Sequence, residues 1–131
     1  MSVFKDKSSF NIKSADLLLR NSYFAPSIHC SYYSCIQYML YILFDKQKID
    51  RGEFASERRV RKGGTHGYAI YLIELQLLKK DRQSYKTFQQ LITELKFLRE
   101  QSDYEPIVIN QGTGYDAYNK AQTITNLLVT L

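Results

Sequence analysis

One uninterrupted stretch, from Pro26 to Phe44, constrains the fold more than any other part of the 131-residue chain. It contains no glycine, no internal proline and no Asp, Glu, Lys or Arg side chain. A helix that is apolar on two adjacent sides is covered by neighbours on both, so we expect a central helix with Pro26 in its first turn. The apolar residues form two helically spaced stripes, one of Tyr33, Ile36, Leu40 and Leu43 and the other of Tyr32, Cys35, Met39 and Ile42.

A third stripe of the same helix is polar, and it decides against a membrane span. Lipid would penalise these groups, whereas water, a partner protein or a functional cleft would accept them. We therefore expect no membrane-spanning segment and a stripe that faces a second protomer or a site. Its residues are His29, Ser31, Ser34, Gln37, Tyr38 and Tyr41.

The rest of the chain predicts four more helices and no strand, because apolar residues recur at a period near 3.6 and no alternation persists. We expect one domain over residues 1–131, folded as an all-α, five-helix, up-and-down bundle. Residues 1–7 are predicted as a loose polar arm. Residues 45–64 are predicted as a basic loop, within which a short helical turn around residues 53–59 is left open. The expected helices cover residues 8–22, 26–44, 65–80, 84–101 and a final segment after the turn at residues 111–114.

The formal net charge of +5 is concentrated in one segment. Residues 46–62 contain seven basic and three acidic side chains, which leaves the rest of the chain close to neutral. Clustered Lys and Arg suit a nucleic-acid backbone, but a charged loop can equally be only a solvated loop, and the sequence leaves both interpretations open. The candidate nucleic-acid-binding residues are Arg58, Arg59, Arg61, Lys62 and His66.

The two cysteines argue for a reducing compartment and against a metal site. Cys30 and Cys35 are five residues apart on one predicted helix, so their side chains diverge and we expect free thiols. Residues 1–10 lack the basic start and apolar run of a secretory signal, which favours a cytoplasmic protein. No phosphate-binding glycine loop or paired-histidine motif is present, so we expect no cofactor and no metal.

Three polar residues are predicted to meet at one end of the bundle. Arg99 falls in the last turn of the fourth helix, and Asp103 and Tyr104 follow just past its end. The structural interpretation is that Arg99 caps carbonyls and pairs with Asp103. The chemical interpretation makes all three candidate catalytic residues. His29 is assigned a structural hydrogen-bonded role, and His66 follows Arg61 in an Arg-x4-His pattern.

Several short motifs, in their order and spacing, resemble those of HEPN domains. The resemblance covers roughly residues 8–131 and is nearest to small stand-alone prokaryotic members. It rests on Leu17-Leu18, Tyr23-Phe24-Ala25, the helix beginning His29-Cys-Ser-Tyr-Tyr-Ser-Cys, Thr65-His66-Gly67, Leu98-Arg99 followed by Ser102-Asp103-Tyr104, and Ala121 in the closing helix.

The resemblance implies a helical homodimer that is often paired with a small nucleotidyltransferase in toxin–antitoxin or defence systems. Active relatives are metal-independent ribonucleases that use an Arg-x4-6-His motif in a dimer cleft. Arg99 matches the arginine of that motif, but Asp103 and Tyr104 stand near the place of the histidine.

Three functions therefore follow as hypotheses. The first is the binding half of a two-component system, which docks a nucleotidyltransferase-like partner and also RNA or a nucleotide. The second is a ribonuclease toxin that acts through Arg99, with Asp103, Tyr104 or His66 in place of the usual histidine. The third is a dimeric scaffold without catalysis.

Overall fold

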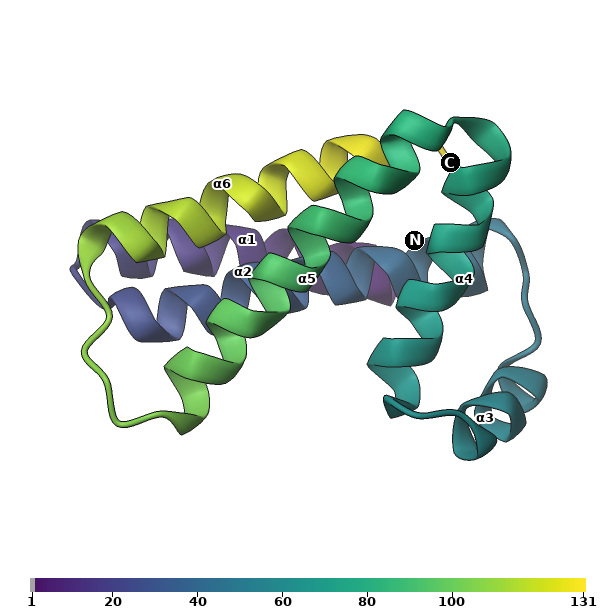
Figure 1. Ribbon diagram of the computed structural model, residues 1–131, viewed down its shortest axis with the longest axis horizontal. Coiled ribbons are helices and arrows are strands. Elements are labelled where there is room, and N and C mark those ends of the chain that lie inside the picture. Colours follow the sequence, from purple (N-terminus) through teal and green to yellow (C-terminus); the bar gives the residue numbers. More distant parts are fainter. Residues whose placement is uncertain (1) are drawn as a thin grey trace.

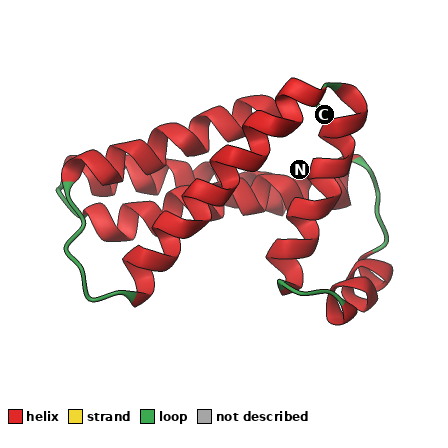
Figure 2. Cartoon of the chain, viewed as in Figure 1, coloured by secondary structure: helices red, strands yellow, loops and turns green. Residues whose placement is uncertain are grey.

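The computed structural model describes residues 2–131, and its regular structure is entirely helical, with no strand in that range (Figure 2). The all-α prediction is therefore confirmed. Six α-helices are present rather than the predicted five. They are α1 (Val3–Arg20), α2 (Phe24–Leu40), α3 (Arg51–Val60), α4 (Gly64–Lys80), α5 (Arg82–Tyr104) and α6 (Gln111–Leu128), with a π-helical segment, η1 (Tyr41–Lys46), continuing α2.

The helix α2 is the centre of the bundle, as its two apolar stripes predict. It packs against α1, α4, α5 and α6. Figure 1 shows α1 running beside α2, α6 lying above both, and α5 crossing in front. Every residue of the two stripes is buried except Tyr33, which is half-buried. Pro26 lies in the first turn of α2, where its missing N–H leaves no hydrogen bond unmade.

Small side chains let the helices around α2 approach closely. The hydroxyl of Ser8 is buried and donates to the backbone oxygen of Ser34 at 2.7 Å, which ties α1 to α2. Gly114 of α6 is also buried, and a Cβ atom there would lie 2.9 Å from Leu19 of α1. A larger residue at position 114 would therefore push α6 away from α1.

The predicted loose arm is wrong within the described residues, because α1 begins at Val3. Ser2 is its N-cap and accepts a hydrogen bond from the backbone N–H of Lys5 at 3.1 Å. The Ser2 hydroxyl also donates to the carboxylate of Asp45, so the start of α1 is fixed to the end of η1. Met1 lies outside the described residues.

The basic segment is not a loop, and this accounts for the sixth helix. Asp50 is the N-cap of α3 and accepts from the backbone N–H of Glu53 at 2.8 Å. Phe54 is the one buried residue of α3, and its ring lies 5.0 Å from that of Phe44 and 4.9 Å from that of Tyr68. A single apolar anchor gives no periodicity, so the sequence pattern indicates at most a short helical turn around residues 53–59 and not the whole helix.

The link from α3 to α4 depends on Gly63. Its backbone has a φ of +93°, and a Cβ atom there would lie 3.0 Å from the Cα atom of Gly67. Only glycine fits this left-handed turn without strain. The turn carries the chain directly from the basic helix α3 into the first turn of α4.

The helix α5 corresponds to the predicted helix over residues 84–101 and is longer than predicted at both ends. Asp81 alone interrupts the helices, and it caps α5 by accepting from the backbone N–H groups of Gln83 and Ser84. At the other end α5 continues through Tyr104 and stops before Pro106, since a residue preceding proline avoids the helical region. Asp103 and Tyr104 thus lie in the last turn of α5, not beyond it.

The helices α4 and α5 meet at Asp81 and diverge toward their other ends (Figure 1). The last turn of α5 and the first turn of α4 therefore stand apart at one end of the bundle, with α2 behind them. No helix within residues 2–131 has the length and apolar character needed to cross a membrane.

Candidate functional site

Arg99 is the one buried charged residue within residues 2–131. It is 9% exposed, and its guanidinium lies 4.9 Å from the ring centre of Tyr32 on α2 and 5.8 Å from that of Tyr104 on its own helix. The Nε atom is buried without a hydrogen-bond partner. A buried guanidinium with an unused donor is a strong attractor for an anion.

Asp103 links Arg99 to His29. One carboxylate oxygen of Asp103 lies 3.6 Å from Nη1 of Arg99 and 3.0 Å from Nδ1 of His29. Because a carboxylate only accepts, Nδ1 of His29 carries the hydrogen and Nε2 is left free for other chemistry. The pairing of Arg99 with Asp103 is the contact that the structural interpretation predicts. The approach of His29 is additional.

His66, in the first turn of α4, lies beside Tyr32 and Tyr33, the tyrosines that also contact Arg99 and His29. Its Nδ1 atom lies 3.2 Å from the hydroxyl of Tyr32. The half-buried ring of Tyr33 contacts both histidines, with centre-to-centre distances of 4.6 Å to His29 and 5.3 Å to His66. Both histidines of the chain therefore flank Tyr33 beside Arg99.

The protonation states follow from burial. Burial lowers the pKa of His66, and the positive charges of Arg99 and Lys96 lower it further, so His66 is neutral at pH 7. Burial raises the pKa of Tyr32 to about 12, so its hydroxyl keeps its hydrogen. In the tautomer of His66 that donates from Nδ1 to Tyr32, Nε2 is free to accept a proton.

The predicted nucleic-acid-binding residues differ in whether other side chains of the protein already engage them. Arg61 is engaged within the protein, since its guanidinium lies 4.7 Å from the ring centre of Tyr71 and 5.1 Å from that of Tyr68, with Glu57 at 3.5 Å. Arg58, Arg59 and Lys62 form no ion pair with any residue of the range 2–131. Arg61 therefore fastens α3 to α4, and the other three remain available for a ligand.

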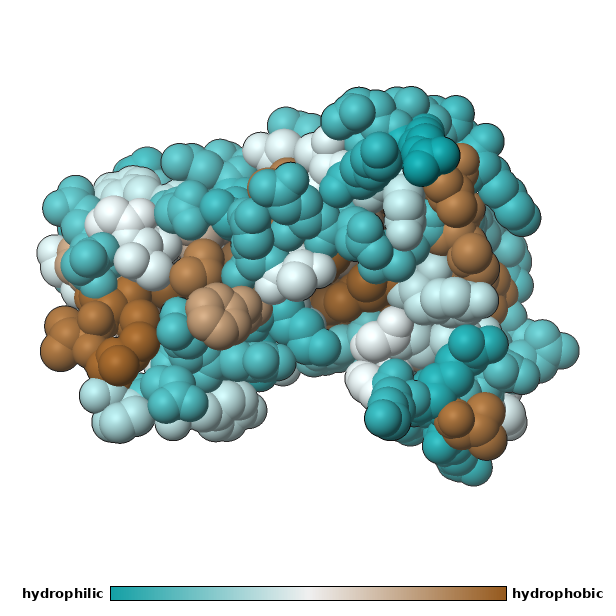
Figure 3. Space-filling view, in the orientation of Figure 1, coloured by the Kyte–Doolittle hydropathy of each residue, from teal (hydrophilic) through white to brown (hydrophobic). Residues whose placement is uncertain are grey.

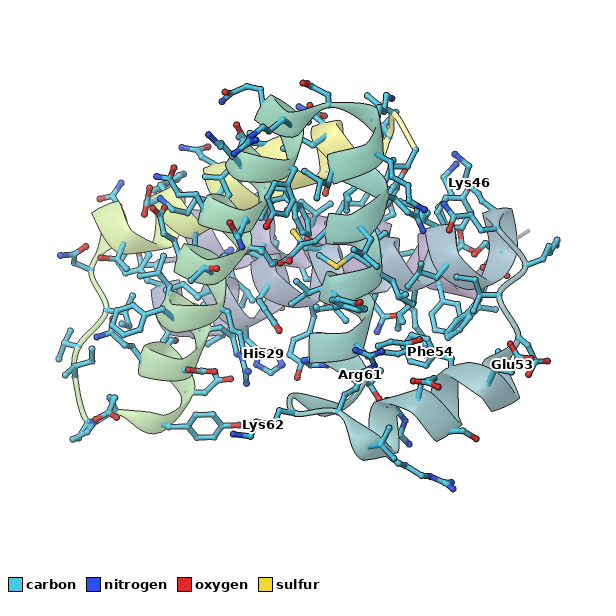
Figure 4. All side chains as sticks on the ribbon, turned by 45° about the vertical axis from the view of Figure 1, so that its right-hand side comes forward. His29, Lys46, Glu53, Phe54, Arg61 and Lys62 are labelled. Carbon is cyan, nitrogen blue, oxygen red and sulfur yellow. The ribbon has the colours of Figure 1, made fainter. Side chains whose placement is uncertain are left out.

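One basic side chain of this segment, that of Lys62, extends toward the site around Arg99. Figure 4 shows His29 in the gap between α5 and α4, with Lys62 extending below it from the link between α3 and α4. The molecular surface is hollowed between the foot of α5 and the corner formed by α3 and α4 (Figure 3). We call this hollow the open end of the bundle.

Two smaller cavities adjoin the open end. One, of about 400 Å³, is lined by Ala25, Pro26, His29, Cys30, Ser102 and Asp103. The other, of about 330 Å³, is lined by Phe97, Arg99, Glu100, Gln101, Tyr104 and Glu105. Cys30 and Cys35 are unpaired, as expected. Within residues 2–131 no group of three or more His, Cys, Asp or Glu side chains is placed to bind a metal ion.

The polar third stripe of α2 is predicted to face a second protomer or a site, but its residues lie in different environments. Only His29 reaches the site, whereas Ser34 is buried against α1 and Tyr38 lines a separate groove with Lys5 and Gln122. The residues that face Arg99 and the histidines are Tyr32 and Tyr33, which the sequence pattern assigned to the core. The spacing of positions 29, 32 and 33 on one helix was the available clue.

Searches of protein-family models, curated protein sequences and solved structures return no match to this chain.

Proposed function

We propose that this protein is a HEPN-like, metal-independent ribonuclease that binds RNA at the open end of the bundle. The observation that supports this most is that the only two histidines of the chain lie beside the buried Arg99. Two imidazoles and a guanidinium are sufficient to cleave an RNA phosphodiester without a metal ion. The hypothesis of an Arg99 ribonuclease is kept, but with His29 added as a catalytic residue.

The roles follow from the hydrogen bonds and the charges. His66, neutral at pH 7, removes the proton from the ribose 2′-hydroxyl, and the 2′-oxygen forms a bond to phosphorus. Arg99 stabilises the negative charge of the phosphorane. The bond from phosphorus to the 5′-oxygen then breaks as His29, acting as an imidazolium whose Nδ1–H is held by Asp103, donates its Nε2 proton to that oxygen. The products are a 2′,3′-cyclic phosphate and a 5′-hydroxyl end.

The test is cleavage of a 5′-labelled single-stranded RNA by purified protein in EDTA. We expect products with 2′,3′-cyclic phosphate ends, and a loss of at least about 100-fold in rate for His29→Ala and for His66→Ala. Lys79→Ala, an exposed change at the far end of α4, should cleave at the wild-type rate. Equal cleavage by the wild type and by Arg99→Ala would trace the activity to a contaminant and refute the proposal.

A second candidate is the binding half of a two-component system, without catalysis. Asp103 favours it, because its carboxylate already pairs with Arg99 and so competes with a phosphate for the guanidinium. RNA that is bound at low salt but remains uncut in the same assay would select this candidate. A nucleotidyltransferase-like protein would then be the expected partner.

The homodimer implied by the resemblance remains part of the proposal. The loop between α5 and α6 exposes Ile107 by 50% and Val108 by 97%, and Figure 3 shows an apolar surface there. Such exposure is unfavourable unless another protein covers it. We expect light scattering to show a dimer at micromolar concentration and Val108→Asp to weaken it. A monomeric wild type would contradict this part of the proposal.

A further inference from the structure

A second feature of the open end is the 330 Å³ cavity at the foot of α5, which the proposed cleavage does not use. Its volume lies at the lower end of the range typical of small-molecule sites, about 300–1,000 Å³. Arg99 forms part of its wall. A group held in this cavity would therefore lie beside the phosphate that Arg99 is proposed to bind.

The walls of the cavity are aromatic and exposed. Phe97 is 58% exposed and Tyr104 is 74% exposed, although large apolar rings are normally covered. Bases of single-stranded RNA stack on such rings, and each stack contributes about 1–3 kcal/mol. The cavity thus offers aromatic surfaces on which a nucleobase can stack.

The rim of the cavity carries two carboxylates, from Glu100 and Glu105. Both residues are exposed, and neither forms an ion pair with any residue of the range 2–131. An ionised carboxylate can only accept hydrogen bonds. Two uncompensated negative charges also repel a polyanion such as RNA. Carboxylates beside an RNA site therefore suit a ligand that offers N–H donors to them, because those hydrogen bonds offset the repulsion.

Guanine is the RNA base that presents such an edge. Its N1–H and N2–H groups are adjacent donors, whereas adenine and cytosine place an acceptor beside the amino group, and uracil flanks its single N–H with two carbonyls. A carboxylate can accept both guanine donors at once. Resting on the function proposed above, we infer that this cavity binds the guanine base of the nucleotide whose phosphate reaches Arg99.

The inference is tested with four labelled uridine pentamers that carry G, A, C or U at the centre. Binding is measured by fluorescence anisotropy in EDTA, in a His29→Ala background that prevents cleavage. We expect the G pentamer to bind about tenfold more tightly than the others. The double variant Glu100→Gln with Glu105→Gln should bind the G pentamer more weakly but the U pentamer more tightly, because repulsion is reduced.

The matched control removes the same two charges from α3, through Glu53→Gln with Glu57→Gln. It should strengthen the binding of all four pentamers alike. If the His29→Ala protein, without further substitutions, bound all four pentamers equally, the guanine pocket would be overturned while RNA binding itself remained. No binding of any pentamer would instead refute the proposed function. A dimer that Tyr104→Ala dissociates would identify the cavity as an interface and also overturn the inference.

Discussion

At the scale of single residues, burial sets the chemistry of the site. Arg99 keeps its charge inside the bundle because Tyr32, Asp103 and Tyr104 surround it with electron-rich groups. Burial, together with the charges of Arg99 and Lys96, lowers the pKa of His66 and so keeps His66 neutral at pH 7. A neutral imidazole beside a guanidinium is the combination that a base acting near a phosphate requires.

The lowered pKa of His66 predicts a dependence of stability on pH. The folded state resists protonation of His66, whereas the unfolded chain takes up the proton near pH 6.5. The contribution of His66 to the free energy of unfolding is therefore complete above pH 6.5, and it is lost as the pH falls below 6.5 and through the lower pKa of the folded state. We expect wild-type stability to fall more steeply than that of His66→Asn between pH 7 and pH 5.

Urea unfolding at a series of pH values measures this difference. Above pH 7.5, where His66 is neutral in both states, the two stability curves should run parallel and serve as the internal control. Identical slopes between pH 7 and pH 5 would show that the environment of His66 does not suppress its protonation.

At the scale of elements, α3 is a short helix attached to the bundle rather than built into it. Phe54 is its one buried residue, and Arg61 stacks on Tyr68 and Tyr71 of α4. Few buried apolar contacts mean a low free energy of local unfolding. The basic helix can therefore detach while the rest of the bundle stays folded.

Replacing Phe54 with alanine should release α3 selectively. A core Phe→Ala change costs about 3–5 kcal/mol, but here the cost is limited to the stability of α3 itself. We expect trypsin to cleave after Arg58 and Arg59 at least about ten times faster, with near-wild-type thermal unfolding of the remaining bundle. Phe88→Ala, in the core of α5, is the control and should lower the stability of the whole protein.

The contrary outcome is equally clear. If Phe54→Ala lowered the unfolding temperature of the bundle as much as Phe88→Ala does, α3 would be part of one cooperative unit. The basic helix would then be a structural element and not a detachable arm.

At the scale of the whole molecule, the divergence of α4 and α5 creates the open end, and Lys62 extends into it from the link between α3 and α4 (Figures 1 and 4). Lys62 thus extends toward the gap that holds His29, although it precedes Arg99 by 37 residues in the sequence. This placement favours the phosphate-binding interpretation of the segment over the solvated one.

Neutralising the arm should weaken RNA binding in a salt-dependent manner. For Arg58→Gln, Arg59→Gln and Lys62→Gln combined, we expect lower affinity for single-stranded RNA. The slope of log affinity against log salt should fall by about 0.7 for each phosphate contact removed. The control replaces Lys7, Lys13 and Arg20 of α1 with glutamine, which removes equal charge far from the open end. Equal losses in the two variants would leave only net charge as the cause.

The sequence by itself determines the central helix and its neighbours, because the periodicity of Ile36, Leu40 and Leu43 is a local property of one segment. It could not determine α3, whose single anchor Phe54 carries no period, or the end of α5, where tertiary contacts such as that of Ser102 with Ala25 extend the helix. Only the tertiary structure decides that His29, His66 and Arg99 meet. They lie on three helices, and no local pattern relates residues that are brought together by the packing of those helices around α2.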